Sequence, residues 1–338
     1  MSSIIKVFDL EFPWQTQDPF LFCVYHKDDF PKGNGKSGPQ ASLAGRNIGQ
    51  DFNSVDGWNM YHGETVPGFP AHPHRGFETI TVVNEGIVDH ADSLSAAGRY
   101  GGGDTQWMTA GKGVQHSEMF PLVNEDEDNP LVLFQIWINL PAISKMVEPH
   151  FAMLWDKDTP VVECADVNGK VSTVKIIAGE LNGHRSASVP PESWANDSEN
   201  AVWVWNIKMP AKAQFTLPAS SAQLNRVLYF YSGQVVTLEA TPIKMPQGVQ
   251  LISDTEVTLN SGEEACEFLL LQGRPIDEPV ARYGPFVMNT EQEIQQAFSD
   301  YRKDQFGGWP WTSSAPVHFD AKARFAKHAD GRLEEPDS

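Results

Sequence analysis

Two short alternating pairs of metal-binding residues constrain this chain more than any other feature of its sequence. The first pair is His72 and His74, and the second is His116 and Glu118. In an extended strand, residues two positions apart point to the same face, so each pair offers two ligands on one side of a sheet. Four ligands from two neighbouring strands can surround one ion. The sequence therefore predicts a metal site built on β-strands.

The segment between the two pairs is rich in short strand patterns and glycine turns. Residues 77–83 are β-branched and apolar, Gly86 interrupts the run, and the glycines at 101–103 precede another strand at 106–109. Such a density of short strands and turns is typical of a barrel or a sandwich. We therefore expect an all-β fold. His90, which stands between Asp89 and Asp92, is interpreted as a solvated turn residue.

A second β region follows a proline-punctuated stretch at 141–149. Residues 227–238 resemble residues 79–90, which indicates an internal duplication. No histidine occurs between His184 and His318, so the second copy cannot hold an HxH site. We expect a metal-binding domain at 1–145, a domain without metal at 146–288, and a C-terminal helix and tail at 289–338.

The C-terminal helix has a clear start signal. Thr290 and Glu293 have the spacing of a capping box, and Ile294, Phe298 and Tyr301 follow at intervals of four and three residues. This pattern predicts an amphipathic helix of about four turns. The polar tail after Phe306 is expected to wrap the surface or to fray.

Charge and cysteine content narrow the class of protein. The net charge is −19, with 44 acidic and 25 basic residues, which argues against direct binding of nucleic acid or an anionic membrane. The three cysteines have no CxxC spacing, so neither a disulfide framework nor a zinc ribbon is indicated. The first residues do not form a signal-peptide pattern. We expect a cytoplasmic monomer.

The ligand types suggest which metal would bind. Histidine and carboxylate without thiolate favour non-haem Fe(II), with Mn, Ni, Co, Cu and Zn as further possibilities. Glu78 is a competing carboxylate, because it lies four residues after His74 and would share its face in a regular strand. From the residues alone, Glu78 could replace Glu118 as a ligand or could lie behind the ligands.

Four segments together resemble the pirin family of the cupin superfamily. They are HPHRGFETIT, GGGDTQWMTAGKGVQHSEM, IWINLP and GPFVMNTEQEIQQAF. The resemblance implies a bicupin, with two antiparallel jelly-roll barrels in tandem and iron only in the first. The family's ligands fall on His72, His74, His116 and Glu118. Pirin-like proteins take their carboxylate ligand from the second motif, so the resemblance implies that Glu78 is not a ligand. The tail after Phe306 extends beyond the core that the family shares.

The resemblance supports two functions of different class. The first is a quercetinase-type oxidoreductase, in which a dioxygenase cleaves a flavonol and Glu118 acts as the catalytic base. Its partners would be an aromatic small molecule and dioxygen. The second is an iron-dependent redox-sensing or regulatory protein that binds a protein partner. For the first, the residues expected to line the pocket are Glu78, Phe77, Trp107, Met108 and Phe120.

Overall fold

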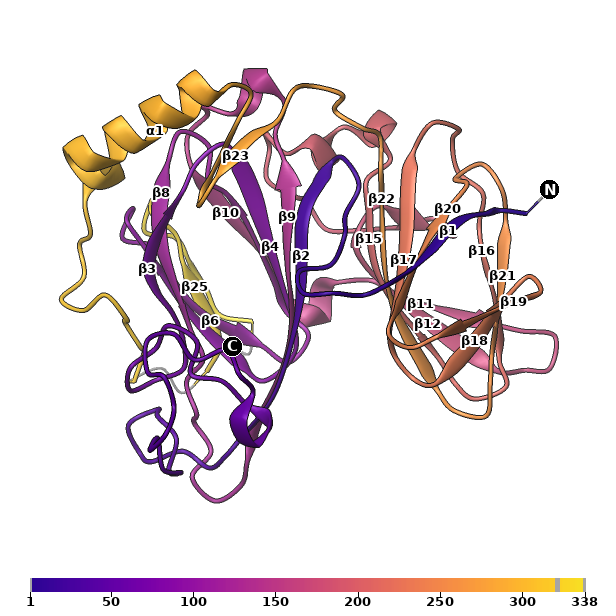
Figure 1. Cartoon of the computed structure of the whole chain (residues 1–338), viewed down its shortest axis with the longest axis horizontal. Helices are drawn as coiled ribbons and strands as arrows, with labels where there is room; N and C mark the ends of the chain where they lie inside the picture. The colour runs from indigo at the N-terminus through magenta and orange to yellow at the C-terminus, as the bar shows by residue number, and fades with distance from the viewer. Residues whose placement is uncertain (1, 320–322, 337–338) are drawn as a thin grey trace. The chain divides into compact units, whose positions relative to one another are not determined.

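The computed structural model describes residues 2–319 and 323–336, and most of its regular structure is β-strand (Figure 1). The chain divides into two compact units. The histidine unit contains Tyr25–Ile136, Leu140–Asp156 and the described residues from Glu278 onward. The apolar unit contains the described residues up to Val24, then Trp137–Asn139 and Lys157–Asp277. The strands of each unit pair in antiparallel fashion, as expected for an all-β fold.

The histidine unit has two large sheets. Their strand orders are β10-β7-β4-β9-β2 and β26-β25-β6-β5-β8-β3. The first contains β2 (Phe20–Phe30), β4 (Phe77–Glu85), β7 (Thr105–Thr109), β9 (Asn129–Asn139) and β10 (His150–Leu154). The second contains β3 (Gly68–His74), β5 (Ile87–Asp92), β6 (Ala97–Gly101), β8 (Val114–Met119), β25 (Phe325–Lys327) and β26 (Leu333–Glu334). The sheets face each other, because Thr81 on β4 donates a hydrogen bond to Glu118 on β8.

The apolar unit repeats this design with a larger first sheet. Its orders are β1-β20-β17-β22-β15-β12-β11 and β16-β21-β18-β19. The first sheet contains β1 (Ile4–Asp9), β11 (Val161–Ala165), β12 (Val171–Ala178), β15 (Trp203–Met209), β17 (Asn225–Ser232), β20 (Gln247–Leu251) and β22 (Cys266–Gly273). The second contains β16 (Gln214–Leu217), β18 (Val235–Leu238), β19 (Thr241–Lys244) and β21 (Val257–Ser261). The predicted pair of antiparallel barrels is therefore present.

Smaller elements complete the two units. Two short hairpins pair β13 (Glu180–Leu181) with β14 (His184–Arg185), and β23 (Ala281–Tyr283) with β24 (Phe286–Met288). The 3-10 helices are Val55–Gly57, Ala142–Ser144, Asp156–Asp158, Trp194–Asn196, Ser198–Asn200 and Gln305–Gly307.

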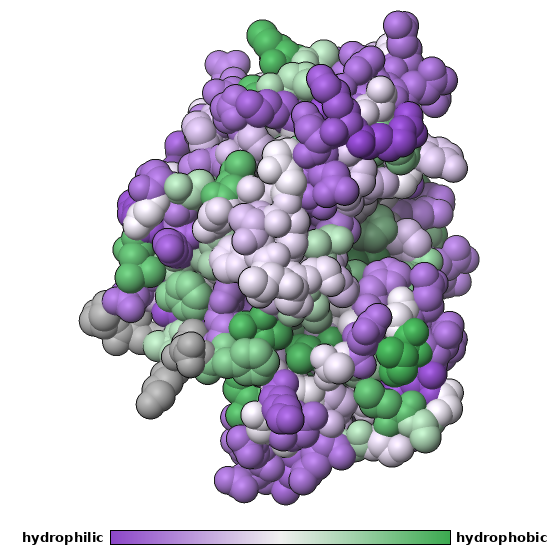
Figure 2. All heavy atoms as spheres, turned by 90° about the vertical axis from the view of Figure 1, so that its left-hand side faces the viewer, coloured by the Kyte–Doolittle hydropathy of each residue, from purple (hydrophilic) through white to green (hydrophobic). Residues whose placement is uncertain are grey.

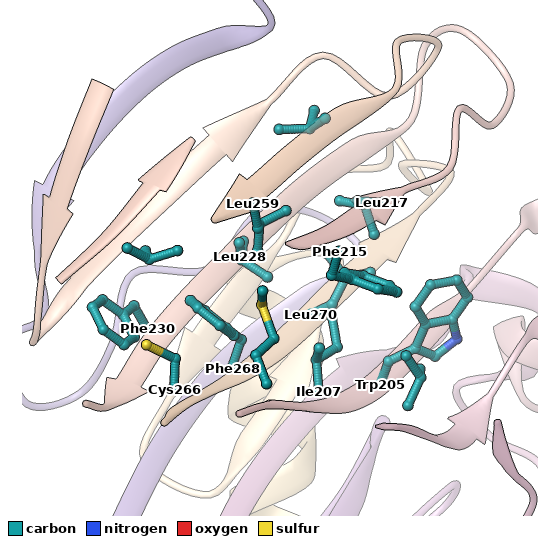
Figure 3. Packing of buried hydrophobic residues seen from close by; sticks show 14 of the residues in the cluster. Trp205, Ile207, Phe215, Leu217, Leu228, Phe230, Leu259, Cys266, Phe268 and Leu270 are labelled. Carbon is teal, nitrogen blue, oxygen red and sulfur yellow. The ribbon is translucent and has the colours of Figure 1, made fainter. Parts of the chain in front are cut away.

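Hydrophobic side chains fill the interior of the apolar unit. Ten of them are labelled in Figure 3, where rings and branched chains from both sheets point toward one another. Trp205, Leu217, Leu259 and Phe268 have no exposed surface. Full burial of such a side chain contributes about 1.5–3 kcal/mol each, so this cluster is the main source of stability in the unit.

The α-helix α1 (Glu291–Asp304) confirms the prediction made from its capping box. The Thr290 hydroxyl accepts a hydrogen bond from the backbone of Glu293 (3.2 Å), and the Glu293 carboxylate accepts one from the backbone of Thr290 (2.8 Å). Ile294 is buried, and the ring of Phe298 lies 4.8 Å from that of Phe286 on β24. The apolar stripe of the helix therefore packs onto the histidine unit.

The C-terminal tail does not fray: residues 309–319 run along the surface, with Trp311 donating a hydrogen bond to the carbonyl of Asp92, and the segment beyond extends a sheet. Ala326 on β25 pairs with Gly98 on β6 and is fully buried. The opposite end of the chain behaves similarly, since β1 pairs with β20 of the apolar unit. The strand near each end of the chain thus pairs with a strand that is distant from it in the sequence. The compact units consequently differ from the contiguous segments 1–145, 146–288 and 289–338.

The face of the molecule drawn in Figure 2 is mainly hydrophilic, with several separate hydrophobic patches. Hydrophilic side chains of this kind agree with the large excess of acidic residues in the sequence. Within 2–319 and 323–336, no helix combines the length and the hydrophobicity needed to cross a membrane.

Candidate metal centre

Strands β3 and β8 bring three histidines together. His72 lies directly opposite His116 in the antiparallel register, and His74 lies two residues further along β3. The ring centres are 4.5 Å apart for His72 and His116, 4.8 Å for His72 and His74, and 4.9 Å for His74 and His116. One nitrogen from each ring lies within 4.8 Å of the others. This cluster could hold a metal ion.

The hydrogen bonding of the cluster fits a bound metal. His72 Nδ1 lies 2.8 Å from the carbonyl oxygen of Pro70. A donated proton there leaves Nε2 of His72 as a lone-pair ligand and fixes the orientation of its ring. In the described part of the chain, neither ring nitrogen of buried His116 has a hydrogen-bond partner. An unmade hydrogen bond of a buried group is costly, so these nitrogens are suited to a metal.

The electrostatics of the cluster also favour metal binding. Burial lowers the pKa of His72 to about 4 and lowers the pKa values of His74 and His116 well below their usual range. The neighbouring imidazoles lower the pKa values of His74 and His116 further, because like charges would repel. All three rings are therefore neutral near pH 7, and neutral imidazole is the form that binds metals.

Glu118 lies beside the cluster and is held by two polar side chains. Its Oε2 is 3.8 Å from Nε2 of His116. Oε1 accepts a hydrogen bond from Thr81 (2.8 Å), and Oε2 accepts one from Gln135 (2.9 Å). Burial raises the pKa of Glu118, and these two hydrogen bonds oppose the rise. The carboxylate is thus placed next to the histidines, and its role as fourth ligand stays a prediction.

Glu78 and Trp107 are not brought to the cluster. The chain turns at Gly76, which has a φ of 85° and sits against the carbonyl oxygen of Val287, so β3 and β4 are separate strands. Thr81 reaches Glu118 from one face of β4, and alternation places Glu78 on the other face. There the Glu78 carboxylate accepts hydrogen bonds from Trp107 (3.1 Å) and Thr109 (2.6 Å). The expectation that Glu78 shares a face with His74 is corrected, because it assumed an unbroken strand.

The other residues expected in the pocket lie at different distances from the cluster. The ring of Phe77 is 5.2 Å from that of His74. Phe120 is 6.0 Å from Phe69, whose ring is 6.4 Å from His72. Met108 is buried in the hydrophobic cluster of the unit. Phe77 therefore touches the candidate centre, and Phe120 touches it only through Phe69.

Comparison with known proteins now identifies the family. Residues 15–138 match the Pirin family, and residues 204–307 match the Pirin C-terminal cupin domain. The chain belongs to the pirin family. Its two units are the cupin domains of that family, and the bicupin prediction is confirmed.

Relatives in this family come from bacteria and plants. A pirin-like protein of Caulobacter vibrioides is 37% identical, over 71% of this chain and 80% of its own length. Pirin-1 of Arabidopsis thaliana is 36% identical, over 71% of this chain and 78% of its own length. The crystal structure of quercetin 2,3-dioxygenase from Acinetobacter baumannii is 25% identical, with a TM-score of 0.70, and covers 91% of this chain and 99% of that chain.

Three further residues of this pirin-family site were missed by sequence reasoning. The placement of His90 in a solvated turn was wrong: it is fully buried on β5, opposite Glu118, with its ring 5.6 Å from that of His116. The acidic neighbours that suggested solvent have partners, because Asp89 pairs with Arg99. Thr81 and Gln135 lie on the other sheet and belong to no metal motif. For Thr81, the only signal in the sequence was the alternation of polar residues along β4.

Proposed function

We propose that this protein is a metal-dependent dioxygenase that cleaves flavonols such as quercetin. The observation that carries the proposal is a cluster of three neutral histidines with a buried carboxylate beside it. The similarity to the quercetin 2,3-dioxygenase of Acinetobacter baumannii gives additional support. In the reaction, a flavonol and dioxygen would yield a ring-opened ester and carbon monoxide.

Iron(II) is the proposed metal, because histidine and carboxylate ligands without thiolate favour it among the first-row metals. His72, His74 and His116 would hold it, with Glu118 as the proposed fourth ligand. When bound, the metal would supply Lewis acidity and electron exchange with dioxygen.

Glu118 is the proposed catalytic base. Its carboxylate would accept the proton of the flavonol 3-hydroxyl, provided that the substrate comes within hydrogen-bond reach. The hydrogen bonds from Thr81 and Gln135 hold both carboxylate oxygens and limit their motion. A carboxylate held in this way loses little entropy when the substrate arrives, which favours proton transfer.

An aromatic side chain would bind a flat ring of the substrate. Phe69 is half-buried and its ring packs near His72, while Phe77 packs against His74. Offset or edge-on contacts between aromatic rings contribute about 0.5–1.5 kcal/mol beyond burial. Phe69 is therefore the proposed binding surface for a flavonol, whereas Phe77 has no exposed surface and would support the ring of His74 from behind.

The proposal can be tested with anaerobically purified, iron-loaded protein given quercetin and oxygen. We expect release of carbon monoxide, and loss of that release in His74→Ala and Glu118→Gln. Glu78→Gln is the matched control, since it changes a buried glutamate on the opposite face of β4 and should keep the activity. Stoichiometric iron without any flavonol turnover would contradict the proposal and would favour the regulatory function.

A further inference from the structure

A cavity of about 530 Å³ lies within the apolar unit, far along the sequence from the candidate metal residues. Part of its wall comes from the start of β15 and the loop before β17, where Ala201, Trp203, Ser220 and Ser221 line it. Serines from the loop after β14 line it as well. A volume of this size lies within the usual range for small-molecule sites.

A buried arginine lies behind this wall and forms no ion pair with a described carboxylate. Arg226 on β17 and Trp203 on β15 both lie opposite Gln272 on β22, so the three residues form one row at the end of the sheet. Arg226 has no exposed surface, and its guanidinium lies 5.4 Å from the centre of the Trp203 ring. It donates hydrogen bonds to Gln272 (2.6 Å) and to the carbonyl of Pro218 (3.0 Å).

One nitrogen of Arg226, Nη2, has no hydrogen-bond partner, and no carboxylate of the described residues forms an ion pair with this guanidinium. Asp254 acts on it electrostatically without ion-pair contact and compensates the charge only in part. Buried charges in proteins are normally paired, because an uncompensated charge in a medium of low polarity is costly. An anion bound nearby would compensate the rest of the charge.

A chain of hydrogen bonds connects Arg226 to the cavity. Gln272 accepts from Arg226 through its oxygen and donates through its amide nitrogen to the Ser220 hydroxyl oxygen (3.3 Å). Because this oxygen accepts a hydrogen bond, its own proton remains available as a donor on the cavity side. Linked hydrogen bonds polarise one another, so the buried cation strengthens Ser220 as a donor.

We propose that this cavity binds a small organic carboxylate through the Ser220 hydroxyl, with the charge of Arg226 as support. A monoanion fits better than phosphate, since Glu180 and Asp197 also line the cavity and would repel a dianion. Glu180 is neutralised by an ion pair with Arg185 (2.8 Å), which reduces the repulsion of a single charge. The Trp203 ring offers an apolar surface for the body of the ligand.

The test compares benzoate with its neutral analogue benzamide, by isothermal titration calorimetry on the metal-free full chain. We expect benzoate to bind at least tenfold more tightly than benzamide. Ser220→Ala should weaken benzoate binding about tenfold, and Thr216→Ala, an exposed residue of β16, should leave it unchanged. His116→Leu should also leave it unchanged, which separates this site from the metal centre.

Arg226→Met removes the supporting charge and should weaken benzoate binding. Its thermal unfolding is recorded first to verify that the unit folds. If it unfolds, Gln272→Glu replaces it as the charge test, because a carboxylate there would pair with Arg226 and should abolish benzoate binding. The proposal is overturned if neither probe binds, if both bind equally, or if Ser220→Ala has no effect.

Discussion

The two barrels of this protein share a strand order and differ in what their inner faces carry. The order β10-β7-β4-β9-β2 of the histidine unit corresponds to β1-β20-β17-β22-β15 of the apolar unit. Likewise, β6-β5-β8-β3 corresponds to β19-β18-β21-β16. Backbone pairing therefore does not explain why one barrel has a candidate metal centre and the other has none among its described residues.

Single side chains explain the difference. In the histidine unit His90 lies opposite Glu118, and in the apolar unit Leu238 lies opposite Leu259. Continuing along the paired strands gives four correspondences: His90 and Leu238, Glu118 and Leu259, His116 and Val257, and His72 and Leu217. Each of these four polar residues has an aliphatic counterpart in the hydrophobic core of the apolar unit, where Figure 3 labels Leu217 and Leu259. The same scaffold thus serves as a site in one copy and as a core in the other.

Placing a carboxylate at the position of the apolar unit that corresponds to Glu118 should have the largest effect on stability. Leu259→Glu puts a charge into a fully buried position without donors like Thr81 and Gln135, and we expect a loss of about 3–5 kcal/mol in the free energy of unfolding. Urea unfolding measures it. Thr258→Glu, on the half-buried side of the same strand, is the control and should cost less than about 1 kcal/mol. Equal losses in both variants would show that a charge costs no more stability on the inner face of β21 than on its outer face.

Acid should weaken the histidine unit more than the apolar unit. Burial lowers the pKa values of His26 and His72 to about 4, below the usual value of about 6.5 in an unfolded chain. Between these values the unfolded state binds more protons, so stability is fully present above pH 6.5 and is lost as the pH falls toward 4. For one such histidine the loss is on the order of 3 kcal/mol.

Hydrogen exchange on metal-free protein, corrected for its intrinsic pH dependence, separates the two units. Protection in β3 and β8 should fall over this pH range while β16 and β21 keep theirs. The raised pKa of Asp28, about 6 because of burial, offsets part of the effect. Protection that falls equally in both barrels would remove this difference between them.

Making the histidine unit resemble the apolar unit should abolish its metal site. His116→Leu introduces the kind of residue that occupies the corresponding position of the other barrel, so the fold should persist. We expect iron affinity to fall by more than about 100-fold, since loss of a ligand exceeds the 10–100-fold effect of losing a supporting residue. Metal analysis after dialysis measures this loss. Full iron occupancy in the variant would mean that His116 is not a ligand.

The smallest expected effect concerns the support of Glu118. Thr81→Val removes one hydrogen bond to the carboxylate, and we expect iron affinity to fall about tenfold. Thr79→Val is the matched control, because Thr79 is equally buried on the same face of β4 but donates nothing to Glu118. A fall of similar size in both variants would assign the effect to general packing.

Much of the fold was predictable because local rules dominate there. The capping box and the apolar spacing of α1 depend on residues three and four positions apart, and the helix begins at Glu291 as expected. The strand at the end of the tail was not predicted because its pairing partner, β6, lies more than two hundred residues earlier in the chain. Glu78 was misplaced because one positive-φ glycine ended the strand that the pattern extended.

By itself, the sequence determined the pairs on β3 and β8, since alternation along a strand depends only on backbone geometry. It also determined that the second copy has no such pairs, because no histidine occurs between His184 and His318. Only the tertiary structure decided that His90, Thr81 and Gln135 surround Glu118, since these contacts cross between strands and between sheets. It also decided that Arg226 is buried without an ion pair to a described carboxylate, because burial and pairing depend on the folded neighbourhood of a charge.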